Sequence, residues 1–216
     1  MQFSILTDYF GTYMEGFRGT ILSSLLALAG SFLLGTLIAV FRISTVRALR
    51  WFGTGYTEFI RNIPLLLVVY IFYYGPSAFG SSLDGFTAGT IGLTVYTSAF
   101  IAEAIRAGIA AVPKGQTEAA RSSGLTYVQT MFHVVLPQAI KLVIPPLGNQ
   151  FINLIKNSSV LTVVAGLDLM YFADIVNTDT FRTFDTYVFV ALFYLVLTLP
   201  LSYGMRVWER RLQRKY

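Results

Sequence analysis

The feature that most constrains this chain is the segment Gly19–Phe41, which contains no charged residue. Its 23 residues form a helix of about 35 Å, and the hydrocarbon core of a bilayer is about 30 Å thick. Only 12% of all residues are charged, about half the proportion found in soluble domains. The sequence therefore predicts an integral membrane protein.

Four further apolar segments follow along the chain. Together they predict a single all-α integral membrane domain over residues 1–216, with five transmembrane helices at about 19–41, 54–79, 86–111, 142–167 and 186–205. Pro145, Pro146 and Gly166 predict that the fourth helix is interrupted, and Pro200 predicts a kink in the fifth. Residues 168–185 are polar and acidic, and we expect them outside the membrane.

The distribution of basic residues predicts the orientation. If the N-terminus lies outside and the chain crosses five times, 13 of the 16 Lys and Arg residues fall on the cytoplasmic side. Seven of the 11 acidic residues then fall outside, and the C-terminus is cytoplasmic. Because the basic residues gather at the ends of apolar runs, they indicate contact with the lipid bilayer and not with nucleic acid.

Several kinds of chemistry are excluded by residue type. The chain has no cysteine and only one histidine, His133, so we expect neither disulfides nor a metal site. It also lacks the GxxxxGK[ST] phosphate loop, because Lys114 and Gly115 are not in that arrangement. We therefore expect a protein without its own ATPase site and without a cofactor in this chain.

Residues 112–137 are too polar to cross a membrane and are predicted to be cytoplasmic. Val112-Pro113 predicts a helix start and Gly124 a helix end or hinge. Beyond Gly124, apolar residues recur at spacings of three and four and predict a short amphipathic helix that ends at Leu136-Pro137; they are Leu125, Val128, Phe132 and Val135. Such a segment lies on the bilayer surface or docks into a groove of a cytoplasmic partner.

A family resemblance favours docking into a cytoplasmic partner. The spacing of Glu118, Ala119, Ala120, Gly124, Val134, Leu136 and Pro137 resembles the EAA signature of permease subunits in bacterial ABC importers, which usually has isoleucine in place of Val134. Four flanking strings are similar to the polar-amino-acid uptake branch of that family: 56–65, 102–108, 147–152 and 156–159. The resemblance covers the chain from about residue 17 to its end.

The resemblance implies a multi-pass subunit of the bacterial cytoplasmic membrane that imports polar amino acids, of the glutamine/glutamate or the basic type. It implies that residues 112–137 couple the chain to two separate ATP-binding cassette subunits, which bind ATP and Mg²⁺. It also implies a second copy of this permease, or a homologous permease, to complete the path. An extracytoplasmic substrate-binding protein would deliver the substrate.

Polar residues within the apolar segments are the candidates for the substrate path. Lys156 is the most deeply placed charge, and Asn149 and Asn153 share its helical face at spacings of four and three. The remaining candidates are Gln150, Asn157, Ser158 and Ser159 in the fourth segment, and Tyr96, Thr97 and Ser98 in the third. Hydrogen bonds between helices, an ion pair of Lys156 and simple packing are the alternative explanations.

Two pairs of opposite charge, Glu58 with Arg61 and Glu103 with Arg106, are each three residues apart and are predicted to form interfacial ion pairs; a role in gating or coupling is the alternative. Two other classes of protein are alternatives to a permease subunit. An ion-driven secondary transporter is the alternative function, although no internal repeat is evident. An intramembrane hydrolase would need Lys156 beside Ser158 or Ser159, and adjacent helical positions do not face one another.

Overall fold

The computed structural model describes residues 2–213, which form helices and connecting turns without a strand. The elements are α1 (Ser4–Asp8), α2 (Phe10–Ile43), α3 (Arg47–Arg61), α4 (Leu65–Tyr74), the 3-10 helix η1 (Pro76–Phe79), α5 (Gly85–Ala110), α6 (Lys114–Ser122), α7 (Tyr127–Thr130), the π-helix η2 (Met131–Val135), α8 (Leu136–Asn157), the 3-10 helix η3 (Ser158–Val164), α9 (Leu169–Thr180) and α10 (Thr183–Gln213). The prediction of an all-α fold is confirmed for these residues.

Four helical stretches of the described chain are long and apolar enough to cross a membrane: Phe10–Ile43, Gly85–Ala110, Tyr127–Val164 and Thr183–Arg211. A fifth is present only if α3 and the helical segment after it, which meet at an angle of 104°, are counted as one span. The prediction of one helix over residues 54–79 is therefore wrong. Pro64 has no N–H to donate and adopts an extended conformation (φ −62°, ψ 142°), so α3 ends at Arg61 and the chain changes direction.

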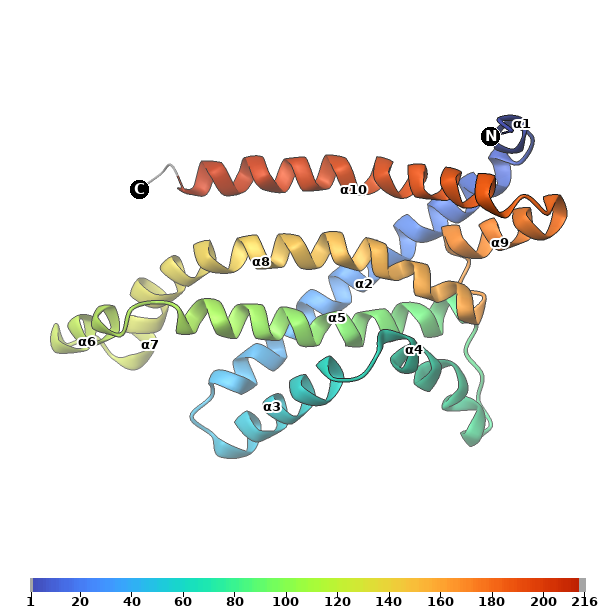
Figure 1. The fold of residues 1–216 in the computed structure, drawn as a ribbon. Helices are drawn as coiled ribbons and strands as arrows, with labels where there is room; N and C mark the ends of the chain where they lie inside the picture. Colours follow the sequence, from blue (N-terminus) through green and yellow to red (C-terminus); the bar gives the residue numbers. More distant parts are fainter. Residues whose placement is uncertain (1, 214–216) are drawn as a thin grey trace.

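Helix α5 forms the centre of the bundle, where it packs against α2, α8 and α4 (Figure 1). Small residues make this close packing possible. An added Cβ at Gly92 would lie 2.9 Å from Cα of Val69 in α4, and one at Gly35 of α2 would lie 2.8 Å from the side chain of Ile101. Small residues at helix contacts are typical of membrane bundles, where backbones approach closely.

The fourth predicted span is interrupted, but not at the prolines. Helix α8 continues through Pro145 and Pro146, and the expected break there is wrong. Membrane helices tolerate proline where neighbouring helices support them, and α8 packs against both α5 and α10. The change occurs at Ser158, where α8 passes into η3. Ala165 and Leu167 then adopt left-handed conformations (φ 55° for both) on either side of Gly166.

The polar segment 168–185 contains a helix that the sequence pattern did not reveal. Asp168 caps α9 by accepting hydrogen bonds from the N–H groups of Met170 (3.0 Å) and Tyr171 (3.3 Å). One face of α9 is buried against α2 and α10. Helix α10 begins three residues before the predicted span and continues through Pro200 to Gln213, and α2 likewise begins nine residues early.

The turn before α9 is clamped by glycines of two helices. A Cβ at Gly19 of α2 would lie 1.9 Å from the carbonyl oxygen of Leu167, and one at Gly85 of α5 would lie 1.7 Å from that of Val164. Thr20 Oγ1 accepts a hydrogen bond from the N–H of Leu169 (3.0 Å). Only glycine permits this approach, so the start of α9 is fixed against the bundle.

Candidate functional site

The segment 112–137 projects from one end of the bundle, where α6 and α7 lie together (Figure 1). Helix α6 ends at a left-handed Gly124 (φ +87°), as its position in the sequence predicts. The N–H of Leu125 donates to the carbonyl of Ala120 (3.2 Å), which is the hydrogen bond of a Schellman cap. Arg121 also donates to the carbonyl of Leu125 (2.7 Å), so the turn is held from both sides.

The second half of the segment continues into the membrane helix. Thr126 and Gln129 form a reciprocal capping box at the start of α7. Pro137 does not end this helix as predicted, because it lies in the first turn of α8, directly after the π-helix 131–135. Pro137 lacks an N–H, but it lies where the backbone hydrogen bonds already change from the π-helical to the α-helical pattern. The side chain of Gln138 donates to the carbonyl of Val134 (2.8 Å).

Only part of the predicted apolar stripe is covered. Val135 is buried with Val112 and Ala139, and Ala120 is 7% exposed. Val128 and Phe132 remain 60% and 64% exposed in this chain. Glu118, Ala119 and Gly124 are exposed, Val134 and Leu136 are partly buried, and Pro137 and His133 are exposed. The segment therefore presents charged and apolar side chains together on its outer surface.

A polar cavity of about 180 Å³ lies between α5 and α8. Tyr96, Thr97 and Phe100 of α5 line one side, and the amides of Gln150, Asn153 and Asn157 of α8 line the other, with Leu154 between them. Amide groups both donate and accept hydrogen bonds, so this wall suits a small polar solute. The antiparallel packing of two helices has brought five of the predicted path residues together.

Other predicted path residues lie outside this cavity. Ser98 is buried and shares a hydrogen bond with the hydroxyl of Tyr56 (2.7 Å). Ser158 and Ser159 donate to the carbonyls of Ile155 and Lys156 (2.8 Å each), so neither is arranged as a nucleophile beside Lys156.

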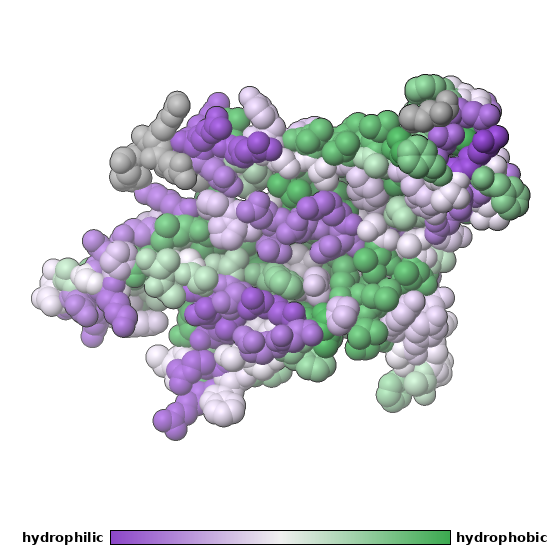
Figure 2. Space-filling model, viewed as in Figure 1, coloured by the Kyte–Doolittle hydropathy of each residue, from purple (hydrophilic) through white to green (hydrophobic). Residues whose placement is uncertain are grey.

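Asn149 and Lys156 are exposed on the open side of α8. Within residues 2–213 no salt bridge involves Lys156, so the alternative explanation, an ion pair of this residue, is not seen in this chain. Figure 2 shows the hydrophilic surface that runs over the middle of α8, and a second such area over α3 on the same face.

A charge cluster joins three helices around Glu103 of α5. Its carboxylate accepts hydrogen bonds from Arg106 (3.2 and 2.6 Å) and from Arg42 at the end of α2, and lies 3.7 Å from Arg61 of α3. The Glu103–Arg106 pair is present as predicted. Arg61 contacts Glu103, and not Glu58 as expected. Arg42 was missed because it is 61 residues from its partner and no local spacing points to it.

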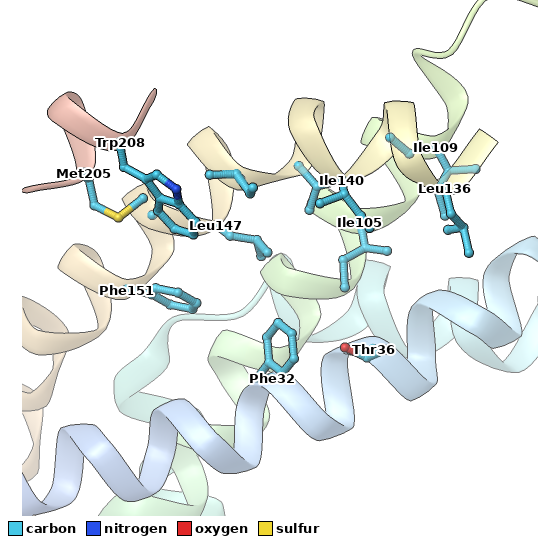
Figure 3. A pocket seen from close by; sticks show the side chains of 14 residues that line it. Phe32, Thr36, Ile105, Ile109, Leu136, Ile140, Leu147, Phe151, Met205 and Trp208 are labelled. Atoms are coloured by element: carbon cyan, nitrogen blue, oxygen red, sulfur yellow. The ribbon is translucent and has the colours of Figure 1, made fainter. Parts of the chain in front are cut away.

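An apolar recess of about 550 Å³ lies on a different side of α8 (Figure 3). Phe32 and Thr36 of α2, Ile105 and Ile109 of α5, and Met205 and Trp208 of α10 face it. At 100° per residue, its α8 members Ile140, Leu147 and Phe151 lie opposite Asn149, Asn153 and Lys156. The hydrophilic face and the apolar recess of α8 are thus separated, and the polar cavity is the better candidate site.

Comparison with known proteins identifies the family. Residues 31–214 match the family described as binding-protein-dependent transport system inner membrane component. The probable glutamine ABC transporter permease protein GlnM of Bacillus subtilis (strain 168) is 64% identical over 216 residues, which cover both chains completely. The L-cystine transport system permease protein TcyB of the same organism is 36% identical over 200 residues, 92% of this chain and 86% of that protein.

A solved structure agrees with these sequence matches. A chain in the crystal structure of an amino acid ABC transporter with histidines has a TM-score of 0.93 and 38% sequence identity, and the match covers 98% of this chain and 99% of that one. The match over residues 31–214 and the identity to these permeases show that the chain belongs to the binding-protein-dependent transport system inner membrane components, the permease subunits of ABC importers.

Proposed function

We propose that this permease carries a polar amino acid across the bacterial cytoplasmic membrane, with glutamine as its main substrate. The observation that carries the proposal is the amide-lined cavity between α5 and α8, whose helical face continues to Asn149 and Lys156. A zwitterionic amino acid that loses its hydration shell needs both donors and acceptors, and the amides supply both. The relative named for glutamine transport, 64% identical along the whole chain, supports the same substrate class.

The proposed assembly is a dimer of permeases, with a second copy or a homologous chain opposite the hydrophilic face of α8. Five crossings, with the N-terminus outside and the C-terminus cytoplasmic, place residues 112–137 in the cytoplasm. A separate substrate-binding protein on the outside would deliver the amino acid. The exposed Lys156 and Asn149 support this arrangement, because charged and amide groups at membrane depth normally face a cavity or a partner.

Residues 112–137 would couple ATP hydrolysis by the partner subunits to transport by this chain. Val128 and Phe132 expose apolar surface beside the exposed Glu118 and Ala119, which fits insertion of this segment into a groove of an ATPase subunit. Two such subunits would bind ATP and Mg²⁺, and their closure would move the segment. Because η2 continues directly into α8, this motion would reach the helix that lines the polar cavity.

The substrate assignment is tested by transport in proteoliposomes that contain the permease, the ATPase subunits and the binding protein. We expect ATP-dependent uptake of radiolabelled glutamine. Asn153→Leu in the cavity wall should reduce uptake at least about tenfold, since it leaves a polar group of the substrate without a partner. Asn177→Leu in α9, away from the cavity, is the control and should retain uptake. A wild-type complex that carries no polar amino acid would refute the proposal.

The coupling role is tested separately. Glu118→Lys should abolish ATP-driven uptake while the protein still inserts into the membrane and purifies as a folded chain. Arg47→Glu, at an exposed position at the start of α3 and outside residues 112–137, serves as the charge-reversal control and should retain uptake. Normal uptake by Glu118→Lys would contradict the coupling role. Uptake by the wild-type permease alone, without any ATPase subunit, would indicate an ion-driven secondary transporter in place of an ABC importer.

A further inference from the structure

The wall of the polar cavity continues along α5 into the charge cluster. Tyr96, Phe100 and Glu103 follow one another at spacings of four and three, so they share one face of the helix. The rings of Tyr96 and Phe100 lie 5.0 Å apart, and both line the cavity. Glu103 lies about one turn further toward the 112–137 end of the bundle. A solute that leaves the cavity toward that end therefore reaches the cluster next.

The cluster contains more positive than negative charge. Three guanidinium groups surround the carboxylate of Glu103, and the charge of Glu58 also acts on Arg106, so three positive charges stand against two negative ones. Arg42 is hydrogen-bonded to it and its side chain is only 7% exposed. Arg106 makes two hydrogen bonds to it. These two arginines supply the three hydrogen bonds that the Glu103 carboxylate accepts within residues 2–213.

Arg61 is held in this cluster in a different way. Its guanidinium lies 3.7 Å from Glu103 and 5.5 Å from the centre of the Phe100 ring, and its side chain is 34% exposed. Among residues 2–213 no group accepts a hydrogen bond from the Arg61 side chain. A charged group and an aromatic ring thus fix its position, while its five N–H donors remain available.

The position of Arg61 in the fold favours a solute as the acceptor. It is the last residue of α3, directly before the bend that leads to α4. Figure 2 shows the hydrophilic area over α3 on the same face as the hydrophilic area over α8. The ring of Phe100, which lines the cavity, is the surface on which the guanidinium rests. Arg61 does not itself line the polar cavity, but its guanidinium lies against a ring that does, and it takes no part in the apolar recess.

We propose that Arg61 binds the α-carboxylate of the amino acid as it passes from the cavity toward the cytoplasm. This inference rests on the proposed amino-acid substrate. A guanidinium matches a carboxylate with two parallel hydrogen bonds, and lysine does not reproduce this geometry. Glu103 acts as a positioning residue, since it keeps Arg61 in place, and the excess positive charge of the cluster attracts the carboxylate.

The experiment measures equilibrium binding of radiolabelled glutamine to the permease–ATPase complex in phosphatidylcholine nanodiscs. The binding protein is omitted, so that its own selectivity does not enter. Unlabelled glutamine and glutamine α-amide, in which a neutral amide replaces the carboxylate, compete for the site. We expect the wild type to prefer glutamine about tenfold or more, the size of effect of one charge-assisted hydrogen bond. Arg61→Gln should lose both the affinity and the preference, and Arg61→Lys should recover only part of them.

Arg47→Gln, an exposed arginine at the start of the same helix, is the matched control and should behave like the wild type. A purely structural role of Arg61 would lower stability and leave the carboxylate preference unchanged, and that result would overturn the inference. Equal binding of glutamine and its α-amide by the wild type would overturn it as well, without any variant. If the wild type neither binds nor transports an amino acid, that result would instead refute the proposed function on which the inference rests.

Discussion

Asp168 provides a quantitative prediction about stability and pH. It lies outside the membrane-spanning segments, is 0% exposed and caps α9. Burial raises the pKa of Asp168 from 3.8 to about 7, against the lowering effect of its hydrogen bonds from Met170 and Tyr171, and the charge of Asp174 adds to the rise. This difference corresponds to about 4 kcal/mol between the neutral and charged forms.

The sign of the effect follows from the raised pKa. Between pH 3.8 and about 7 the folded protein holds the Asp168 proton and the unfolded chain does not. The contribution of Asp168 to stability is therefore greatest at low pH, falls as the pH rises through this window, and is constant above it. Acidification from about pH 8 to about pH 5.5 should stabilise the fold by about 2 kcal/mol through this residue alone.

Asp168→Asn tests this reasoning. Asparagine is also a good N-cap, and its side-chain oxygen can accept the same backbone hydrogen bonds without a charge. In thermal unfolding of the purified permease, acidification should raise the melting temperature of the wild type by about 4–8 °C more than that of the variant. Asp179→Asn, exposed on the same helix, should keep the wild-type pH dependence. If Asp168→Asn kept it too, the argument from burial would be refuted.

Three further predictions concern packing and charge. Gly19→Ala should destabilise the fold by about 1–3 kcal/mol in thermal unfolding, because its Cβ would lie 1.9 Å from the carbonyl oxygen of Leu167, and unchanged stability would contradict this packing. Gly124→Ala, at φ +87°, should cost about 1–2 kcal/mol and lower amide-exchange protection in residues 114–130, whereas Gly115→Ala, with open space around it, should not. Glu103→Gln removes the carboxylate from three guanidiniums. Because Arg42 is buried while Arg61 and Arg106 are 34% and 36% exposed, we expect a loss of about 1–3 kcal/mol, measured as reduced thermal stability; unchanged stability would show that the cluster is solvated.

The errors of the sequence-based prediction have a common physical origin. An average over an apolar window reports the free energy of transfer into the bilayer, but not the direction of the helix. Residues 54–79 are apolar enough to span, yet Pro64 divides them into two helices that meet at 104°. The opposite error occurred in residues 168–185. Their mean hydropathy is low because only one face of α9 is apolar, so the helix was not predicted.

The candidate site was predicted in part. Helical spacing correctly placed Asn149, Asn153 and Lys156 on one face, since that relation depends only on the helix itself. It did not show that Asn153 would face Tyr96 across a cavity while Ser98 would be buried against Tyr56. Those contacts depend on which face of α5 meets which neighbouring helix.

The sequence by itself determined that this chain is a helical membrane protein, where most of its helices lie, and that residues 112–137 form a polar segment with a hinge at Gly124. These properties follow from local sums of transfer free energy and from backbone preferences of single residues. Only the tertiary structure decided that α3 and α4 meet at a bend, that three arginines from three helices surround Glu103, and that α5 and α8 enclose a polar cavity. Each depends on close approach between residues far apart in the chain, which glycine and small side chains permit but no local pattern specifies.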